Sequence, residues 1–258
     1  MPSEHRVAIV TGSATGIGAA VARRLASSGV RIVINYRKSK TDAEATAAAC
    51  KSAGGEALLH ECDVSHDDDC RAMVAAAAER WGRVDYLVNN AGTTKYVDHK
   101  NLDGLSAEDF QRIYSVNVIG AFQMARAAAP HMRKVGHAAI VNVSSTAGLR
   151  GTGSSIAYAA SKAALNTLTL SLARVLAPEI RVNAVCPGFV KTRWVKEGLG
   201  EESFAARIAS YELLSPLKIS STPDDVAQTI VWLLADATHL TGECLRLDDG
   251  THLVNPGR

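Results

Sequence analysis

The chain has 258 residues, of which 47% are hydrophobic and 21% are charged, and its formal net charge is +2. A chain of this length and composition can bury a sizeable core, and we expect one α/β domain. Its 28 Lys and Arg are scattered among 26 Asp and Glu, so a basic surface for nucleic acid or for a membrane is not expected.

The sequence begins MPSEHRVAIVTGS, in which the only apolar run, Val7 to Val10, has the length of a strand rather than of a secretory signal. No window reaches the roughly 18 consecutive apolar residues of a membrane span. The cysteines are odd in number and widely spaced, which favours reduced thiols over a disulfide framework. They are Cys50, Cys62, Cys70, Cys186 and Cys244. We therefore expect a cytoplasmic protein.

Short runs of β-branched residues alternate with longer alanine-rich stretches along the whole chain. The runs expected to be strands are 6–10, 31–36, 56–64, 84–92, 138–145, 180–188 and 243–250. Near-continuous apolar strands separated by helices are typical of a parallel sheet that is covered on both faces. The sequence predicts a single Rossmann-type, doubly wound α/β domain over residues 1–258 with about seven parallel strands.

Capping boxes mark several expected helix starts. They pair Thr41 with Glu44, Ser65 with Asp68, Ser106 with Asp109, and Thr222 with Asp225. Segment 191–220 has no clear period, and an insert of this length is typical of a substrate lid. Its apolar residues, such as Leu199, Phe204, Ile208, Tyr211 and Leu214, are interspersed with Lys196, Glu201 and Arg207.

The first expected strand leads directly into TGSATGIG, which is followed by an alanine-rich helix. Glycines at such a turn let a ligand approach the backbone, and the amides at a helix start attract a diphosphate. The spacing, GxxxGxG, differs from the usual GxGxxG, and a tight turn needed for packing alone would give the same pattern. The candidate cofactor-binding residues are Gly12, Ser13, Thr15, Gly16, Ile17 and Gly18.

The second expected strand ends in INYRKSK. A site that prefers NAD usually has an acidic residue about 20 positions beyond the glycines, where it binds the ribose 2′-hydroxyl. Tyr36 lies 18 residues after Gly18, and Arg37, Lys38 and Lys40 follow it in place of a carboxylate. Cations suit a 2′-phosphate, so NADP(H) is favoured while NAD(H) stays possible. The same residues also fit a solvated basic loop.

Further motifs follow in order along the chain. They are NNAG at 89–92, Asn117 in YSVNVIG, Ser145 in IVNVSSTAG, YAASK at 158–162, and VCPGFVKT at 185–192. Together with the glycine turn, this ordered set resembles the short-chain dehydrogenase/reductase family, from Val7 to about Gly250. A general similarity to 3-oxoacyl carrier-protein reductases is also present. The sequence LDDG near the end departs from the family's frequent DGG, which leaves the subfamily open.

The resemblance implies a catalytic tetrad of Asn117, Ser145, Tyr158 and Lys162. Ser145 is preferred to Ser144 because it lies 13 residues before Tyr158, which is the family's usual separation. The resemblance also assigns Asp63 to the adenine, Asn90 to the cofactor ribose, and Pro187 and Gly188 to the nicotinamide. The remaining residues expected at the cofactor are Val64, Ala91, Gly92, Val190 and Thr192, with Tyr158 and Lys162.

Tyr158 and Lys162 are four residues apart, so on a helix they share one face. A tyrosine, with a pKa near 10, needs roughly 4 kcal/mol of stabilisation of its phenolate to carry protons near pH 7. An ammonium at about 4 Å supplies about 1 kcal/mol in water and about 4 kcal/mol in a sheltered site. The pair is therefore expected to be sheltered, with Lys162 lowering the pKa of Tyr158. The expected reaction is hydride transfer between a nicotinamide and a ketone or aldehyde, with Tyr158 as general acid or base.

Other classes of function fit the sequence less well. His60, Cys62, His66 and Cys70 match no zinc-ligand spacing, so no metal is expected. GSSIA, with Ser155, lacks the final glycine and the strand context of a hydrolase nucleophile. A methyltransferase would have no use for Tyr158 and Lys162, and a catalytically silent dinucleotide-binding regulator would be expected to have lost part of the tetrad.

The sequence leaves the substrate open among a 3-oxoacyl thioester, a steroid-like ketone, a sugar and a small diketone. An NAD(H)-dependent alcohol or sugar dehydrogenase of the same family stays an alternative. The resemblance implies that the helices near 107–133 and 158–177 pair across a two-fold axis. A homodimer or homotetramer is therefore expected.

Overall fold

The computed structural model describes residues 6–254. Its strands form one parallel sheet, in the order β3-β2-β1-β4-β5-β6-β7. The strands are β1 (Val7–Val10), β2 (Arg31–Tyr36), β3 (Ala57–Glu61), β4 (Tyr86–Asn89), β5 (Ala138–Val143), β6 (Ile180–Pro187) and β7 (Cys244–Leu247). The predicted parallel, doubly wound sheet is confirmed. The strand order reverses between β1 and β4, and ligands of such sheets bind at the carboxyl ends of the strands near this point.

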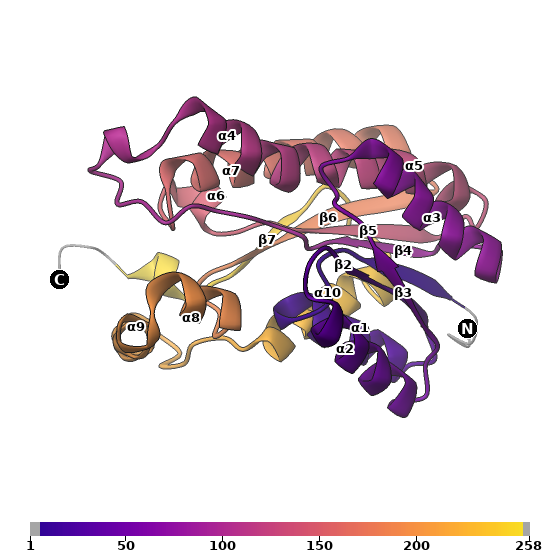
Figure 1. The fold of residues 1–258 in the computed structure, drawn as a ribbon, viewed down its shortest axis with the longest axis horizontal. Helices are drawn as coiled ribbons and strands as arrows, with labels where there is room; N and C mark the ends of the chain where they lie inside the picture. Colours follow the sequence, from indigo (N-terminus) through magenta and orange to yellow (C-terminus); the bar gives the residue numbers. More distant parts are fainter. Residues whose placement is uncertain (1–5, 255–258) are drawn as a thin grey trace.

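Helices cover both faces of the sheet (Figure 1). One face carries α1 (Gly16–Ala26), α2 (Lys40–Ser52) and α10 (Pro223–Ala235). The other carries α3 (Asp67–Trp81), α5 (Ala121–Arg133) and α7 (Ile156–Leu176). The remaining helical segments are η1 (Leu102–Gly104), α4 (Ala107–Tyr114), η2 (Ser115–Gly120), α6 (Ala147–Arg150), α8 (Arg193–Leu199), α9 (Glu201–Leu214) and η3 (Thr251–Leu253).

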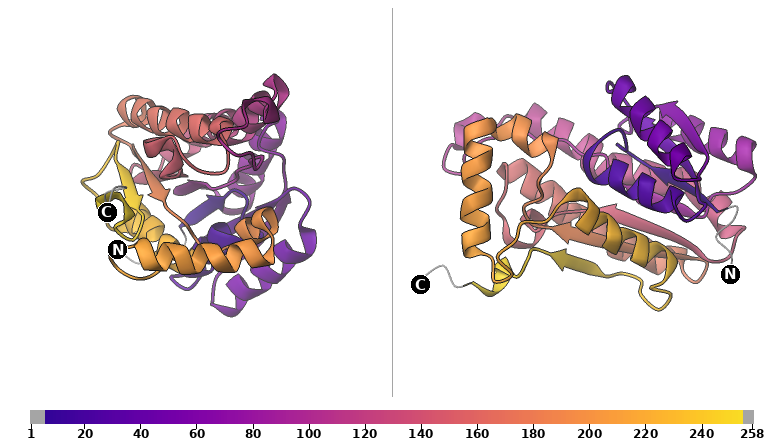
Figure 2. Two further views of the ribbon diagram at one scale, coloured as in Figure 1. Left: turned by 90° about the vertical axis from the view of Figure 1, so that its left-hand side faces the viewer. Right: turned by 90° about the horizontal axis from the view of Figure 1, so that it is seen from below.

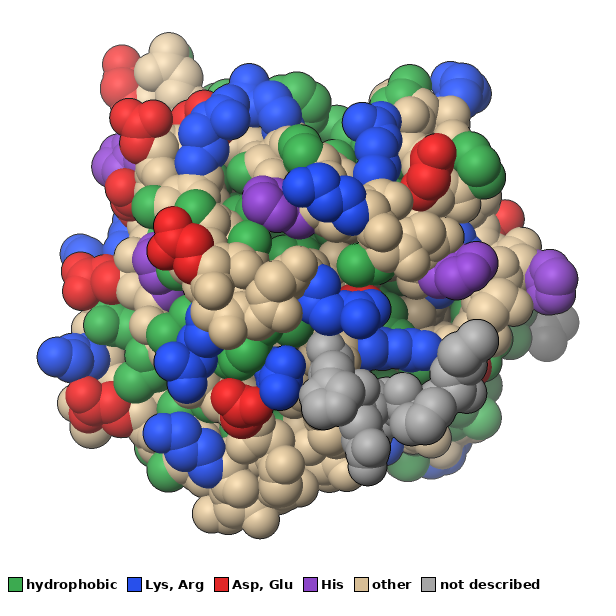
Figure 3. All heavy atoms as spheres, turned by 90° about the vertical axis from the view of Figure 1, so that its right-hand side faces the viewer, with side chains coloured by type: hydrophobic (Ala, Val, Ile, Leu, Met, Phe, Trp, Pro, Cys, Tyr) green, Lys and Arg blue, Asp and Glu red, His purple; other side chains and the backbone are tan. Residues whose placement is uncertain are grey.

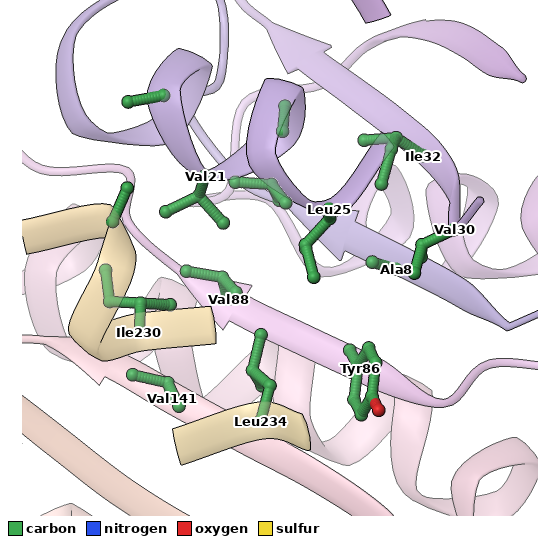
Figure 4. Packing of buried hydrophobic residues seen from close by; sticks show 14 of the residues in the cluster. Ala8, Val21, Leu25, Val30, Ile32, Tyr86, Val88, Val141, Ile230 and Leu234 are labelled. Carbon is green, nitrogen blue, oxygen red and sulfur yellow. The ribbon is translucent and has the colours of Figure 1, made fainter. Parts of the chain in front are cut away.

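The core consists of two layers because successive strand residues point to opposite faces. In β1, Ala8 and Val10 belong to the cluster beneath α1 and α10, whereas Val7 and Ile9 belong to the cluster beneath α3 and α5. Figure 4 shows Val21, Leu25 and Ile230 of the first cluster meeting over the sheet. This packing explains why the strands have no polar face.

Two of the predicted capping boxes are present, and two are not. Ser106 and Thr222 each accept a hydrogen bond from the backbone N–H of Asp109 and Asp225, and each aspartate binds back. The Thr41 prediction is wrong, since α2 begins at Lys40, one residue before it.

The Ser65 prediction is also wrong. The hydroxyl of Ser65 donates to Asp63 Oδ1 at 2.7 Å, and α3 begins two residues later, at Asp67. The carboxylate of Asp63, at the end of β3, therefore takes the hydroxyl that the helix was expected to use.

Segment 191–220, which shows no clear period in the sequence, contains α8 and α9, joined at Gly200 with a φ of +82°. Such a positive φ favours glycine. Both helices lie at the carboxyl edge of the sheet, and Figure 2 shows α9 in orange across this edge. The segment therefore lies where a ligand of the sheet would bind.

No helix within residues 6–254 has the length and apolar character needed to cross a bilayer. Figure 3 shows the opposite edge of the sheet, where the strands begin. Side chains of Lys and Arg lie there among those of Asp and Glu, without a stripe of one sign.

Candidate active site

The glycine turn after β1 is held by polar contacts within the fold. Gly12 has a φ of +60°, and a Cβ built there would lie 3.0 Å from Ala91 Cα, so the turn requires glycine. Its N–H donates to Asn35 Oδ1 at 2.8 Å. The hydroxyl of Ser13 accepts from Asn35 N and donates to Val10 O. Sequence reasoning missed Asn35, a buried amide within an apolar strand, which ties this turn to β2.

The start of α1 retains the capacity to bind an anion. Thr15 is the N-cap residue, but its side chain does not cap the helix, and the first turn contains no acidic residue. The first amides and the positive end of the helix dipole are therefore not neutralised by a side chain. Thr192, at the start of α8, lies across from Gly16, where a Cβ would be 3.9 Å from its methyl group.

The loop after β4 is fixed against this turn. Thr11 Oγ1 accepts hydrogen bonds from the N–H groups of Asn90 and Ala91, each at 2.9 Å. The side chain of Asn90 donates to the carbonyls of Thr11 and Gly12. These contacts join the two sequence motifs into one wall at the ends of β1 and β4.

The predicted basic cluster lies at the end of β2, but one of its cations is paired. Arg37 Nη1 lies 2.9 Å from Asp63 Oδ2, at the end of β3. Burial alone would raise the pKa of Asp63, but hydrogen bonds from Ser65 and Arg37 bring it below its usual value. Lys38 and Lys40 are exposed and form no ion pair with the described residues. The strand end itself has no acid, as the sequence shows, but the neighbouring strand supplies one.

A cavity of about 260 Å³ extends from the glycine turn to α7. The predicted site residues that line it are Gly12, Thr15, Gly16, Ile17, Asn90, Ala91, Gly92, Ser145, Tyr158, Lys162, Pro187, Gly188, Val190 and Thr192. The predicted residues outside its lining are Ser13, Gly18, Tyr36, Arg37, Lys38, Asp63, Val64 and Asn117. Arg193, Trp194 and Val195 of α8 also line the cavity, and sequence reasoning did not assign them to the cofactor.

Ser145, Tyr158 and Lys162 come together where β5 ends and α7 begins. Ser155 caps α7, and its hydroxyl accepts from the N–H of Tyr158 at 3.3 Å. Ser144 also lines the cavity, but its hydroxyl is engaged within the fold, since it donates to the carbonyl of Lys162 at 3.1 Å. Ser145 lines the cavity together with Tyr158, and its hydroxyl accepts from the N–H of Ala147 at 3.1 Å.

Lys162 is buried, and its ammonium donates to the carbonyl of Val143 at 2.8 Å. Its Nζ lies 5.6 Å from the centre of the Tyr158 ring. Burial lowers the pKa of Lys162 to about 8. The lysine is therefore sheltered from solvent, as expected, and burial destabilises its charged form.

The expected lowering of the pKa of Tyr158 is not seen in the chain alone. Burial raises the pKa of Tyr158 to about 12, although the hydrogen bond from Ser145 lowers it. Burial strengthens the attraction between the Tyr158 phenolate and Lys162, but it also removes water from the phenolate. The loss of water has the larger effect on the pKa of Tyr158.

Asn117 lies in η2, a π-helical segment between α4 and α5, and is buried. Its Oδ1 accepts from Thr93 N at 2.8 Å, and its Nδ2 donates to Thr93 O and to Ser161 Oγ, each at 3.0 Å. A Cβ on Gly92 would lie 3.6 Å from Asn117 Oδ1 and 3.8 Å from Lys162 Nζ. Asn117 and Lys162 therefore both lie next to Gly92, and the amide of Asn117 is engaged by Thr93 and Ser161.

A second cavity, of about 660 Å³, adjoins the first. Its walls come from segment 96–98, from α6 and the residues after it, and from α8 and α9. Ser145 and Tyr158 line both cavities. A reactive group at Tyr158 can thus contact one ligand from each side.

No group of three or more His, Cys, Asp or Glu that could hold a metal ion occurs within residues 6–254. Cys62, after β3, and Cys70, on α3, are both buried in the apolar cluster on this face of the sheet. Burial lowers the pKa of His60 on β3.

Comparison with known proteins agrees with this geometry. A family model described as Enoyl-(Acyl carrier protein) reductase matches residues 12–252. A Streptomyces violaceoruber protein described as ketoacyl reductase 2 of the granaticin polyketide synthase is 43% identical, over 97% of this chain and 98% of its own length. The 3-oxoacyl-[acyl-carrier-protein] reductase of Synechocystis is 35% identical, over 95% and 96%.

A solved structure from Burkholderia xenovorans, described as a short-chain dehydrogenase/reductase, superposes with a TM-score of 0.90. Its sequence is 43% identical, and the match covers 96% of this chain and 98% of that one. The similarity therefore extends over the sheet, both cavities and α8 and α9.

Proposed function

Because the chain belongs to the short-chain dehydrogenase/reductase family and is an oxidoreductase, we propose that it interconverts a ketone or aldehyde and an alcohol, with NADP(H) favoured over NAD(H). One observation carries the proposal: Tyr158 and Ser145 line both the cavity at the glycine turn and the larger cavity beside it. Two ligands can therefore meet at one proton-carrying side chain.

The residues of the first cavity fit a nicotinamide dinucleotide. Gly12 leaves the backbone open where a Cβ would collide with Ala91, and α1 begins with uncapped amides that favour a diphosphate. When bound, the nicotinamide supplies or accepts the hydride. Pro187 and Gly188 would lie beside it, at the end of the cavity that contains Tyr158.

Tyr158 is proposed as the general acid of reduction. With a pKa of about 12 in the chain alone, it holds its proton at neutral pH and can donate it to a developing alkoxide. Ser145, which lines both cavities with Tyr158, would hold the substrate oxygen at that proton. In oxidation Tyr158 must first lose its proton, and any positive charge brought into the cavity lowers the cost of that loss.

Lys162 is proposed to hold the cofactor ribose and to favour the phenolate of Tyr158. Its ammonium uses one donor on Val143 O, and a lysine has three donors. Asn117 is proposed to anchor a water that connects Lys162 to solvent. The amide keeps one acceptor position on Oδ1 after binding Thr93 N.

The preference for NADP(H) is supported by Arg37, Lys38 and Lys40 at the end of β2. A 2′-phosphate would compete with Asp63 for Arg37, while the two lysines form no ion pair with described residues. NAD(H) stays the alternative, since Asp63 supplies a carboxylate near this position. We also propose that the protein is cytoplasmic and forms a homodimer or homotetramer. Segment 191–220 is proposed to act as a substrate lid within a single domain.

The proposal is tested with a panel of ketones, aldehydes and alcohols, assayed with NADPH, NADH and their oxidised forms by absorbance of the reduced nicotinamide. We expect turnover with at least one carbonyl compound, and a lower KM for NADPH than for NADH. Calorimetric titration with S-adenosylmethionine is the control, for which no binding is expected. Tight binding of NADPH without turnover of any carbonyl compound would instead indicate a regulator.

A further inference from the structure

The larger cavity contains two cations that the proposed proton transfer does not use. Arg150 and Arg207 both line it and are exposed. Neither guanidinium has a hydrogen bond or an ion pair with any residue between 6 and 254. The only acidic residue in the lining is Asp98, whose Oδ1 accepts from Lys100 N. The lining therefore has more positive than negative charge, and its two arginines have no partner among residues 6–254.

The two arginines belong to different walls. Arg150 ends α6, five residues after Ser145, and is thus attached to the core of the sheet. Arg207 lies on α9, in the segment proposed as a lid. A ligand group that binds both would join the lid to the core.

The wall nearest Tyr158 is aromatic. The rings of Trp194 and Tyr158 are 6.2 Å apart, and those of Trp194 and Tyr96 are 6.5 Å apart, both tilted. Phe189 and Tyr211 line the same cavity, with their ring centres 5.5 Å apart. Flat apolar groups pack well against such rings.

We propose that the substrate has an aromatic body, with its reacting carbonyl at Tyr158 and an anionic group bound by Arg150 and Arg207. This inference rests on the proposed function and adds the substrate class to it. Guanidinium groups match carboxylates, sulfonates and phosphates in shape and charge. The aromatic wall holds the ring, and the arginines hold the charged end.

An anionic group can come from two sources, a free aromatic acid or the phosphates of an acyl thioester. The test uses matched pairs of probes for both. The first pair is 6-formyl-2-naphthoate and its methyl ester, and the second is acetoacetyl-coenzyme A and ethyl acetoacetate. The first pair differs mainly in its anionic group, whereas the second also differs in the thioester, the pantetheine arm and the adenine nucleotide of coenzyme A.

The variants are Arg150→Gln, Arg207→Gln and the double variant, with Arg24→Gln as the matched control. Arg24 is an exposed arginine of α1 that does not line either cavity. For the wild type we expect kcat/KM to be about tenfold higher for the naphthoate than for its ester. Each single variant should lose about tenfold with the naphthoate, through KM rather than kcat. The ester should be unaffected, as should both compounds in Arg24→Gln.

Equal kcat/KM for acid and ester in the wild type, or equal losses for both in the double variant, would overturn the inference and leave the proposed function standing. If the arginine variants lose kcat/KM only with acetoacetyl-coenzyme A, the arginines bind the phosphates of a thioester. The proposal of an aromatic acid would then be wrong. If the wild type turns over none of the probes, the proposed function fails for them. Calorimetric binding of the naphthoate to the wild type and to the double variant then decides whether the anion site exists.

Discussion

Lys162 is a buried cation, and its burial makes the stability of the protein depend on pH. Its pKa falls from 10.5 to about 8 on folding. Below pH 8 the lysine is charged in both states, and the folded state bears the cost of burying that charge. As the pH rises from 8 towards 10.5, the folded state releases the proton first, so this cost disappears.

We therefore predict that Lys162→Met changes the pH dependence of stability. Relative to the variant, the wild type should gain about 2–3 kcal/mol between pH 7 and pH 10. Urea unfolding of both cofactor-free proteins at several pH values measures this. A difference that stays constant with pH would show that Lys162 titrates as an exposed lysine does.

The cations after β2 provide a second prediction. Lys38→Ala should raise the KM for NADPH by about tenfold, because the lysine is proposed to bind the 2′-phosphate. The KM for NADH should stay unchanged. Lys51→Ala, an exposed lysine at the other end of α2, is the control. Equal effects on the two cofactors would favour the solvated-loop reading of this cluster.

Two helices far apart in the sequence are joined across the first cavity. Arg193 of α8 binds Asp42 of α2 through two contacts, of 3.0 and 2.7 Å. Arg193 also lines the cavity, and it contacts Glu197 of its own helix at 3.4 Å. The α2–α8 ion pair therefore holds the proposed lid over the cofactor site.

Asp42→Asn should accelerate release of NADPH, by about two- to fivefold because both partners are partly exposed. Stopped-flow fluorescence measures the rate. Glu197→Gln removes the contact within α8 without detaching it from α2, so its rate should match the wild type. If both variants release NADPH equally faster than the wild type, loss of any carboxylate beside Arg193 explains the effect. The contact between α8 and α2 would then have no specific role in NADPH release.

The sequence predicts local contacts, unless another nearby group competes for the same side chain, and it does not predict contacts between distant residues. The capping boxes at Ser106 and Thr222 are present because each hydroxyl contacts the carboxylate three residues later. At Ser65 the prediction fails because Asp63, outside the helix, takes its hydroxyl. Asp42 and Arg193 are 151 residues apart, and no local pattern indicates their contact.

The seven strands were predictable because each is an apolar run between helical stretches, and a buried parallel sheet needs such runs. Their order brings the ends of β1, β4, β5 and β6 to one edge, where the motifs meet. The second cavity was not predictable, since its walls depend on how α8 and α9 lie over that edge. The raised pKa of Tyr158 was missed for the same reason: desolvation depends on the surrounding fold.

Large apolar side chains are exposed on α5, η2 and α7. Ile119, Phe122, Leu170 and Val175 are 48%, 40%, 47% and 63% exposed. The family resemblance implies that these helices pair between subunits. We predict that Phe122→Glu with Leu170→Glu lowers the oligomeric state measured by sedimentation. Leu217→Glu, at a residue 65% exposed outside these helices, should leave it unchanged. An unaltered sedimentation coefficient in the double variant would exclude this pairing.

The most direct test of the proposed chemistry is the turnover of Tyr158→Phe, measured beside its affinity for NADPH. The substitution removes one hydroxyl and leaves the ring against Trp194. With the carbonyl compound that the wild type reduces best, kcat should fall by about 10²–10⁴-fold while the Kd for NADPH changes little. A variant that binds NADPH and keeps the wild-type kcat would contradict the role of Tyr158 as the proton carrier.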